Sequence, residues 1–159
     1  EKIKESLKYM DLKTIILEPG RFIVGNSGVL ITRVLYVKCK QLKNFIIVDA
    51  GMNDLIRPSF YGSYHLIYPL KIKKGDKKKF DVVGPICETG DYFGKEREFS
   101  ENIKPGDYLA IMSAGAYGFS MSSNYNLRLR PAEVIVKDKK FFLIRKRETY
   151  KGLFDLENV

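Results

Sequence analysis

The stretch Val29-Leu30-Ile31-Thr32-Arg33-Val34-Leu35-Tyr36-Val37-Lys38 is rich in the β-branched and aromatic residues that favour strands. Six more short runs of this kind follow, separated by Gly, Pro, Asn and Lys: residues 45–49, 65–70, 80–85, 108–112, 132–136 and 141–145. Strands at this spacing predict a mainly β domain, folded as a barrel or a sandwich. The last two runs are joined by Lys137-Asp138-Lys139-Lys140, which predicts a hairpin turn.

The two ends of the chain have a different pattern. Glu1–Met10 carries apolar residues four and three positions apart, which predicts a short amphipathic helix. Thr14–Leu17 is uncharged, mostly apolar and followed by Pro19-Gly20, the pattern of a strand buried on both faces of a parallel sheet. A short helical turn is expected over residues 22–26, and a short helix over residues 148–156.

The composition predicts one folded domain. A chain of 159 residues with 45% hydrophobic and 13% aromatic residues is long enough for a sizeable core, and this argues against disorder. No apolar run approaches the roughly 18 residues of a transmembrane helix, and the N-terminus lacks the apolar core of a signal peptide. We therefore expect a soluble, cytoplasmic protein with no membrane partner.

Cysteine and histidine are scarce. Cys39 and Cys87 are too few for a disulfide framework, so both thiols are expected to be reduced. His65 is the only histidine, which leaves no zinc-type cluster, and we expect no metal site. His65 lies in an apolar run, where a structural role is favoured. Asp91 and Asp107 are expected to form turns rather than to act as acids.

The net charge of +9 raises a second class of function, a basic β-barrel that binds nucleic acid. The densest basic runs, Lys71–Lys79 and Lys137–Arg147, flank predicted turns, and the first lacks the interleaved aromatic residues of a stacking surface. We therefore favour a solvated, lysine-rich surface without a specific nucleic-acid partner, and keep the nucleic-acid barrel as the alternative.

Four short motifs contain residues suited to chemistry: Glu18-Pro19-Gly20-Arg21, Arg57-Pro58-Ser59-Phe60-Tyr61, Cys87-Glu88-Thr89-Gly90-Asp91 and Gly115-Ala116-Tyr117-Gly118. Each has an ordinary structural explanation: a Pro-Gly turn, a surface arginine, a buried thiol and a packed tyrosine. Each also suits a ligand. A glycine lets a phosphate approach the backbone, and a guanidinium with a phenol suits a carboxylate. The Cys-Glu pair can serve one pocket only if the chain turns after it.

In this order, the four motifs resemble the C-terminal half of the diaminopimelate decarboxylases, pyridoxal-phosphate enzymes of the alanine-racemase-like group. The resemblance extends from about Leu12 to Glu157. It implies decarboxylation of meso-2,6-diaminopimelate to L-lysine and CO2, the last step of lysine biosynthesis. It also implies the β-barrel or sandwich domain of a fold-type III enzyme over residues 28–159, with the C-terminal segment returning to a (β/α)8 barrel. Residues 1–27 would be the last helix and strand of that barrel.

The resemblance assigns two of the motifs to the cofactor. Glu18, Pro19, Gly20 and Arg21 would lie against the phosphate of pyridoxal 5'-phosphate, and Arg21 would also reach the substrate. Tyr117 would contact both the cofactor and the substrate.

The resemblance assigns the other two motifs to the substrate. Arg57 and Tyr61 would bind the carboxylate at the far end of diaminopimelate. Cys87 would donate a proton after carbon dioxide departs, while Glu88 would hold the far ammonium group. Both come from the opposite subunit in this family, which implies a homodimer with shared active sites.

Two expectations concern substrate choice and completeness. Ornithine decarboxylases resemble this chain but usually carry Asp at the position of Glu88 and lack the pair Arg57 and Tyr61, so diaminopimelate is favoured over ornithine or another basic amino acid. Nothing here matches the early barrel strand that carries the family's Schiff-base lysine. We therefore expect that the chain alone is inactive and that a barrel domain or a separate barrel chain completes it.

Overall fold

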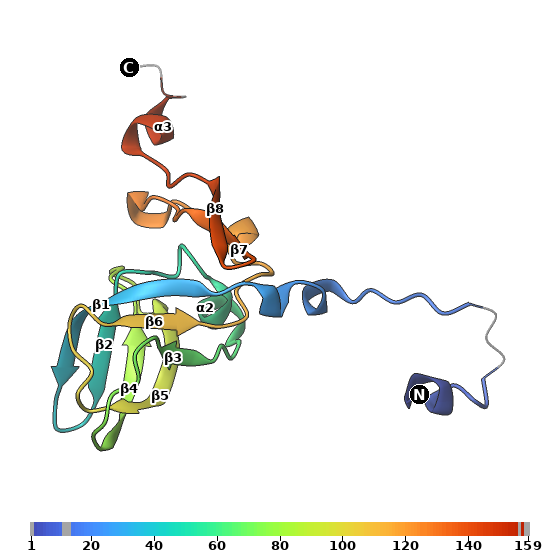
Figure 1. The fold of residues 1–159 in the computed structure, drawn as a ribbon, viewed down its shortest axis with the longest axis horizontal. Helices are drawn as coiled ribbons and strands as arrows, with labels where there is room; N and C mark the ends of the chain where they lie inside the picture. Colours follow the sequence, from blue (N-terminus) through green and yellow to red (C-terminus); the bar gives the residue numbers. More distant parts are fainter. Residues whose placement is uncertain (1, 11–13, 156, 158–159) are drawn as a thin grey trace.

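A computed structural model describes residues 2–10, 14–155 and 157 (Figure 1). Its strands form a six-stranded sheet of order β3-β6-β1-β2-β4-β5 and a two-stranded sheet of β7 and β8. The strands are β1 Leu30–Cys39, β2 Asn44–Val48, β3 Ile67–Pro69, β4 Lys77–Val83, β5 Tyr92–Ser100, β6 Tyr108–Ile111, β7 Glu133–Lys137 and β8 Lys140–Arg145. The helices are α1 Lys2–Ser6, α2 Arg57–Tyr61 and α3 Tyr150–Phe154, with 3-10 turns η1 Gly20–Phe22, η2 Gly25–Ser27, η3 Phe119–Met121 and η4 Tyr125–Leu127. None of the described helices is long and apolar enough to cross a membrane.

The six-stranded sheet curls into a nearly closed barrel. Strands β2 and β4 run parallel, and the other neighbouring pairs are antiparallel. The two strands at opposite ends of the order, β3 and β5, contact each other. Beside this seam the guanidinium of Arg97 lies 3.9 Å from the ring centroid of Tyr64. The prediction of a mainly β, barrel-like domain is therefore confirmed.

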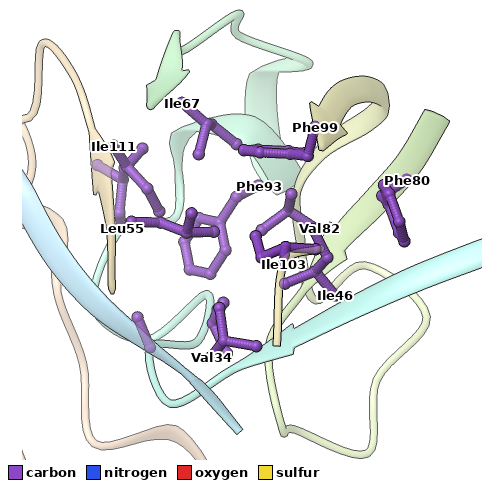
Figure 2. Packing of buried hydrophobic residues seen from close by; sticks show 13 residues of the cluster. Val34, Ile46, Leu55, Ile67, Phe80, Val82, Phe93, Phe99, Ile103 and Ile111 are labelled. Atoms are coloured by element: carbon purple, nitrogen blue, oxygen red, sulfur yellow. The ribbon is translucent and has the colours of Figure 1, made fainter. Parts of the chain in front are cut away.

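Every strand of the barrel contributes to one apolar core. Figure 2 shows these side chains converging between the strands. The buried cluster comprises Val34, Ile46, Val48, Ala50, Leu55, Ile67, Phe80, Val82, Phe93, Phe99, Ile103, Leu109 and Ile111. Since burial of one large apolar side chain stabilises by about 1.5–3 kcal/mol, this cluster is the main source of stability in the chain.

Strand β5 was not predicted from the sequence. Its middle is Lys95-Glu96-Arg97-Glu98, and these four charged residues hide the strand pattern. Phe93 and Phe99 are nevertheless both buried, and because they are six positions apart they share a face even in a regular strand. Glu96 has a φ of 51° and donates its N–H to Asp81 Oδ1 at 2.9 Å. This irregularity shifts the pairing of β5 with β4, while the four charged residues between the two phenylalanines hide the apolar pattern in the sequence.

The N-terminal segment corrects one prediction. Thr14–Leu17 is not a strand but an exposed, extended segment. A strand of a parallel sheet needs neighbours to satisfy its backbone groups, and no described strand pairs with this segment. Helix α1 is shorter than the predicted 1–10, and the turn predicted over 22–26 is divided between η1 and η2. Helix α3 lies inside the predicted 148–156; residues 1 and 156 lie outside the described residues.

The hairpin of β7 and β8 lies outside the barrel core. Its turn residues Asp138 and Lys139 have φ values of 49° and 61°, which matches the predicted turn. In Figure 1 the hairpin projects beside the barrel, followed by α3. Its apolar side chains are exposed on both faces: Val134, Ile135, Val136, Phe141, Phe142, Leu143 and Ile144.

Candidate functional site

The loop that carries Tyr117 is joined to the segment after η1 by contacts that exclude side chains. Gly115 donates its N–H to Gly25 O at 3.0 Å, and Ala114 donates to Gly28 O at 2.9 Å. A Cβ built on Gly115 would lie 2.1 Å from Val24 O, and one on Gly28 would lie 2.5 Å from Gly115 Cα. Glycine at these positions therefore holds the first and last motifs together.

Gly20 and Tyr117 meet at this junction. Gly20 has a φ of +49°, and a Cβ on it would lie 3.6 Å from the phenolic oxygen of Tyr117. Tyr117 itself has a φ of 60°, an uncommon conformation for a bulky residue that points to a functional position. Glu18, Pro19 and Arg21 are exposed beside them. The helical turn expected over residues 22–26 is divided between the three-residue 3-10 turns η1 and η2, and neither is long enough to supply a helix dipole for a phosphate.

Arg57 lies between two tyrosines. Its guanidinium carbon is 5.3 Å from the ring centroid of Tyr61 and 5.4 Å from that of Tyr117. Helix α2 begins at Arg57 and ends before Gly62, whose φ is +61°, so the arginine and the tyrosine four residues later share a face. Arg57 Nη2 donates to Ser63 Oγ at 3.3 Å, while Arg57 Nε is buried without a hydrogen-bond partner among the described residues.

His65 is buried near the positive charges of this cluster. Its Nδ1 lies 2.8 Å from Met112 O. Burial lowers the pKa of His65, and the positive charges of Arg57, Arg21 and Arg97 lower it further. The contact with a backbone carbonyl agrees with the predicted structural role.

The Cys87-Glu88 pair lies in an exposed turn after β4. Both side chains are exposed, and the thiols of Cys87 and Cys39 are free. Glu88 Oε1 accepts hydrogen bonds from Gly90 N and Thr89 Oγ1, each at 3.0 Å. These bonds hold the pKa of Glu88 below its ordinary value, so the carboxylate is ionised near neutral pH. The prediction that the chain turns after the pair is confirmed by the Asp91 N to Glu88 O bond of 3.1 Å.

Two residues that the sequence analysis did not place in the site hold this turn. Asp91 is buried and accepts from Met52 N at 2.6 Å and Ile86 N at 2.7 Å. Ser59 Oγ donates to Gly90 O. Asp91 was expected to form a turn, but it also connects two loops; Ser59 stands 31 positions from its partner, and no local pattern reveals such a contact.

Asp107 is the other predicted turn-former. Its carboxylate accepts from Lys104 N at 2.8 Å and from Lys73 Nζ at 2.5 Å. Burial opposes ionisation of Asp107, but the bonds to Lys73 and Lys104 outweigh it and lower the pKa. Asp107 therefore has the expected structural role, at a turn before β6.

The predicted site residues thus fall into two connected groups. Gly20, Tyr117, Arg57 and Tyr61 form one cluster, with Arg21 close enough to influence His65. The turn of Cys87 and Glu88 is attached to α2, the helix of Arg57 and Tyr61, by the hydrogen bond of Ser59. Glu18 and Pro19 are exposed at the approach to the cluster.

Comparison with known proteins identifies the class. Residues 15–115 match the family described as pyridoxal-dependent decarboxylase, C-terminal sheet domain, and the chain belongs to this family. The resemblance predicted from the four motifs is therefore confirmed.

Within that class the chain is similar to diaminopimelate decarboxylases. It is 57% identical over 148 residues to the diaminopimelate decarboxylase of Aquifex aeolicus, which covers 93% of this chain and 35% of the relative. The crystal structure of that enzyme from M. jannaschii matches with a TM-score of 0.88 and 42% identity, over 99% of this chain and 36% of the other. The Helicobacter pylori enzyme complexed with L-lysine matches with a TM-score of 0.82 and 48% identity, over 98% and 38%. The chain thus spans roughly a third of the length of these relatives.

Proposed function

We propose that this chain is the C-terminal part of a diaminopimelate decarboxylase, which converts meso-2,6-diaminopimelate to L-lysine and CO2 in the cytoplasm. The observation that carries the proposal is the position of Arg57, whose guanidinium lies between Tyr61 and Tyr117. A second arginine at the site is useful only for a substrate with a second carboxylate. The names of the similar proteins support the same substrate.

Pyridoxal 5'-phosphate fits the residues at the junction of the first and last motifs. Gly20 presents a backbone without a side chain toward the hydroxyl of Tyr117, and that hydroxyl can donate to a phosphate without adding charge. Glu18, Pro19, Gly20, Arg21 and Tyr117 would hold the cofactor there. When bound, the cofactor supplies the electron sink that permits loss of the α-carboxylate.

Arg57 and Tyr61 would bind the far carboxylate of the substrate. The N–H at Arg57 Nε is buried and has no partner among the described residues, so a ligand oxygen that reached it would satisfy this donor. A guanidinium binds a carboxylate through two parallel hydrogen bonds, and an unpaired buried donor carries a desolvation penalty that such a ligand removes. Ornithine has no carboxylate at this end, so Arg57 would favour diaminopimelate.

Cys87 and Glu88 would act from the turn after β4. The ionised carboxylate of Glu88 would hold the far ammonium group of the substrate. The thiol of Cys87 would donate a proton to the carbon that has lost its carboxylate. In the proposed homodimer, the turn of one subunit serves the active site of the other.

A (β/α)8 barrel would complete the enzyme and provide the Schiff-base lysine. We assign residues 1–27 to the end of that barrel and residues 28–159 to the sheet domain, with the C-terminal segment returning to the barrel. The exposed apolar residues of Thr14–Leu17 and of the β7–β8 hairpin support this assignment, because a barrel would cover them. Alone, the chain would be inactive.

Substrate preference tests the role of Arg57. In the complete enzyme, the wild type is expected to form lysine from diaminopimelate and to react poorly with ornithine, whereas Arg57→Ala loses this preference by about 100-fold or more. Arg33→Ala, at an exposed arginine of β1, is the matched control and should retain it. Equal discrimination by the wild type and Arg57→Ala would overturn the assignment, and a wild type that prefers ornithine would establish the alternative substrate.

The two exposed cysteines offer a matched test of the proton donor. Cys87→Ala should lower turnover by about 100-fold while cofactor binding, measured by absorbance titration, changes little. Cys39→Ala should leave both unchanged. Unchanged lysine formation by Cys87→Ala would contradict the acid role. If the chain instead bound oligonucleotides with an affinity that fell steeply with salt, the nucleic-acid alternative would be favoured.

A further inference from the structure

Two side chains outside the proposed chemistry anchor the Cys87-Glu88 turn to different parts of the fold. Asp91 connects the end of the turn to the loop after β2 through Met52 N, and to the start of the turn through Ile86 N. Ser59 connects the turn to α2 through Gly90 O. The thiol and the carboxylate therefore lie on a segment that is held at both ends.

The Asp91 side chain is buried, with a relative exposure of 4% for the residue. A Cβ built on Gly84 would lie 2.2 Å from Asp91 Oδ2, so only glycine fits beside it. Each carboxylate oxygen accepts one backbone N–H, from Met52 at 2.6 Å and from Ile86 at 2.7 Å. Removal of one acceptor would leave a backbone donor without a partner in a region where water has little access.

The loop that Asp91 binds is itself fixed. Asp54 Oδ2 accepts from Gly51 N at 2.8 Å, and Asn53 Oδ1 accepts from Arg128 Nε at 2.9 Å. Both Asn53 and Asp54 are buried. Asp91 thus connects the turn to a loop that is itself held by the hydrogen bonds of buried side chains.

Ser59 provides the second link, and it comes from the helix of Arg57 and Tyr61. It lies two positions after Arg57 and two before Tyr61, on a helix of five residues. Its hydroxyl donates to Gly90 O, so the helix and the turn are joined by a hydrogen bond. Displacement of the turn therefore has to break a contact with α2.

We propose that Ser59 and Asp91 are positioning residues, which hold the Cys87-Glu88 turn against α2 and thereby determine where its thiol and carboxylate meet the substrate. The part played by the turn in catalysis rests on the proposed function. The positioning is a property of this chain and is measurable without activity. The two variants that remove the links are Ser59→Ala and Asp91→Asn.

Amide hydrogen exchange of the 159-residue chain tests the positioning directly. Each variant should accelerate exchange by about tenfold at residues 86–92, while β2 and β6 exchange as in the wild type. Ser59→Thr keeps the hydroxyl and should restore slow exchange. Ser100→Ala and Asp107→Asn are matched controls, because they remove a serine and an aspartate hydrogen bond away from the turn. Unchanged exchange at 86–92, or equal acceleration in all strands, would overturn the inference.

Kinetics of the complete enzyme tests the consequence. Ser59→Ala and Asp91→Asn should lower kcat about tenfold with little change in cofactor affinity, while Ser59→Thr retains activity. An unchanged kcat in both variants would overturn the inference even if the wild type makes lysine. If the wild type makes no lysine but exchange changes as expected, the positioning holds and the proposed function is wrong.

Discussion

The barrel and the β7–β8 hairpin are built from similar residues but bury them differently. Both consist of strands rich in Val, Ile, Leu and Phe. Phe93 in the barrel is 1% exposed, whereas Phe141 in the hairpin is 80% exposed. The barrel is nearly closed by the contact of β3 with β5, whereas each strand of the hairpin pairs only with the other among the described strands. Local pattern thus predicts a strand but not what covers it.

The largest effect should come from truncating one phenylalanine in each region. In the chain, Phe93→Ala should lower the free energy of unfolding by about 3–5 kcal/mol, because it leaves a cavity in the core. Phe141→Ala should change it by less than about 1 kcal/mol, because the ring is already in water. Urea denaturation followed by circular dichroism measures both values. Equal losses would show that the hairpin is part of the same core.

The second-largest loss of stability should follow a substitution at the junction between the N-terminal segment and the Tyr117 loop. Gly115→Ala should destabilise by about 1–3 kcal/mol, because the new methyl group would overlap Val24 O. Gly152→Ala in α3 is the control, since its nearest neighbour would be Thr149 Oγ1 at 3.4 Å and alanine favours helices. Urea denaturation measures the free energy of unfolding of both variants. A Gly115→Ala variant as stable as the control would mean that the two segments are not packed as described.

His65 should make the stability of the barrel depend on pH. Burial lowers its pKa in the folded state below the ordinary 6.5, so the unfolded chain binds a proton first as the pH falls. The stability that neutral, buried His65 contributes is fully present above pH 6.5, the pKa in the unfolded chain. It is lost as the pH falls from 6.5 to the lowered pKa of the folded state. The slope cannot exceed about 1.4 kcal/mol per pH unit for one proton. In His65→Gln, the slope between pH 7 and pH 5 should be shallower; an identical slope would assign the dependence to other groups.

The smallest effect should be local to the hairpin. Lys139→Gly should stabilise the turn by up to about 1 kcal/mol, because Lys139 has a φ of 61° that glycine adopts without strain. Amide exchange in β7 and β8 should slow, while the urea midpoint of the barrel stays constant. Lys137→Gly, at a strand position, should instead accelerate exchange. A shift of the barrel midpoint by Lys139→Gly would show that the two regions unfold together.

The strands rich in apolar and β-branched residues were predictable, and the strand with a charged middle was not. Val29–Lys38 and Phe45–Asp49 correspond closely to β1 and β2 because both runs are rich in the β-branched and aromatic residues that favour strands. β5 escaped prediction because four charged residues fill its middle and separate the two buried phenylalanines near its ends. The strand predicted over Thr14–Leu17 was wrong for the opposite reason. The segment has the pattern of a strand, but a strand forms only where another strand pairs with it.

For the candidate site, the motifs were recognisable in the sequence, and the contacts between their residues were not. The motifs of Arg57, Cys87 and Tyr117 were recognisable by residue type and order. The position of Arg57 between two rings depends on the loop of Tyr117, which lies 60 positions further along the chain. The hydrogen bond from Ser59 to Gly90 spans 31 positions, and no local rule relates the two residues.

By itself, the sequence determined the class of the protein, because short motifs of fixed residue type reflect chemistry that tolerates few substitutes. It also determined a mainly β fold, since β-branched and aromatic side chains favour an extended backbone locally. Only the tertiary structure decided which strands close the barrel, which apolar faces remain exposed, and how the Cys87-Glu88 turn is fixed to α2. These features depend on contacts between distant segments, whose geometry exists only after the chain has folded.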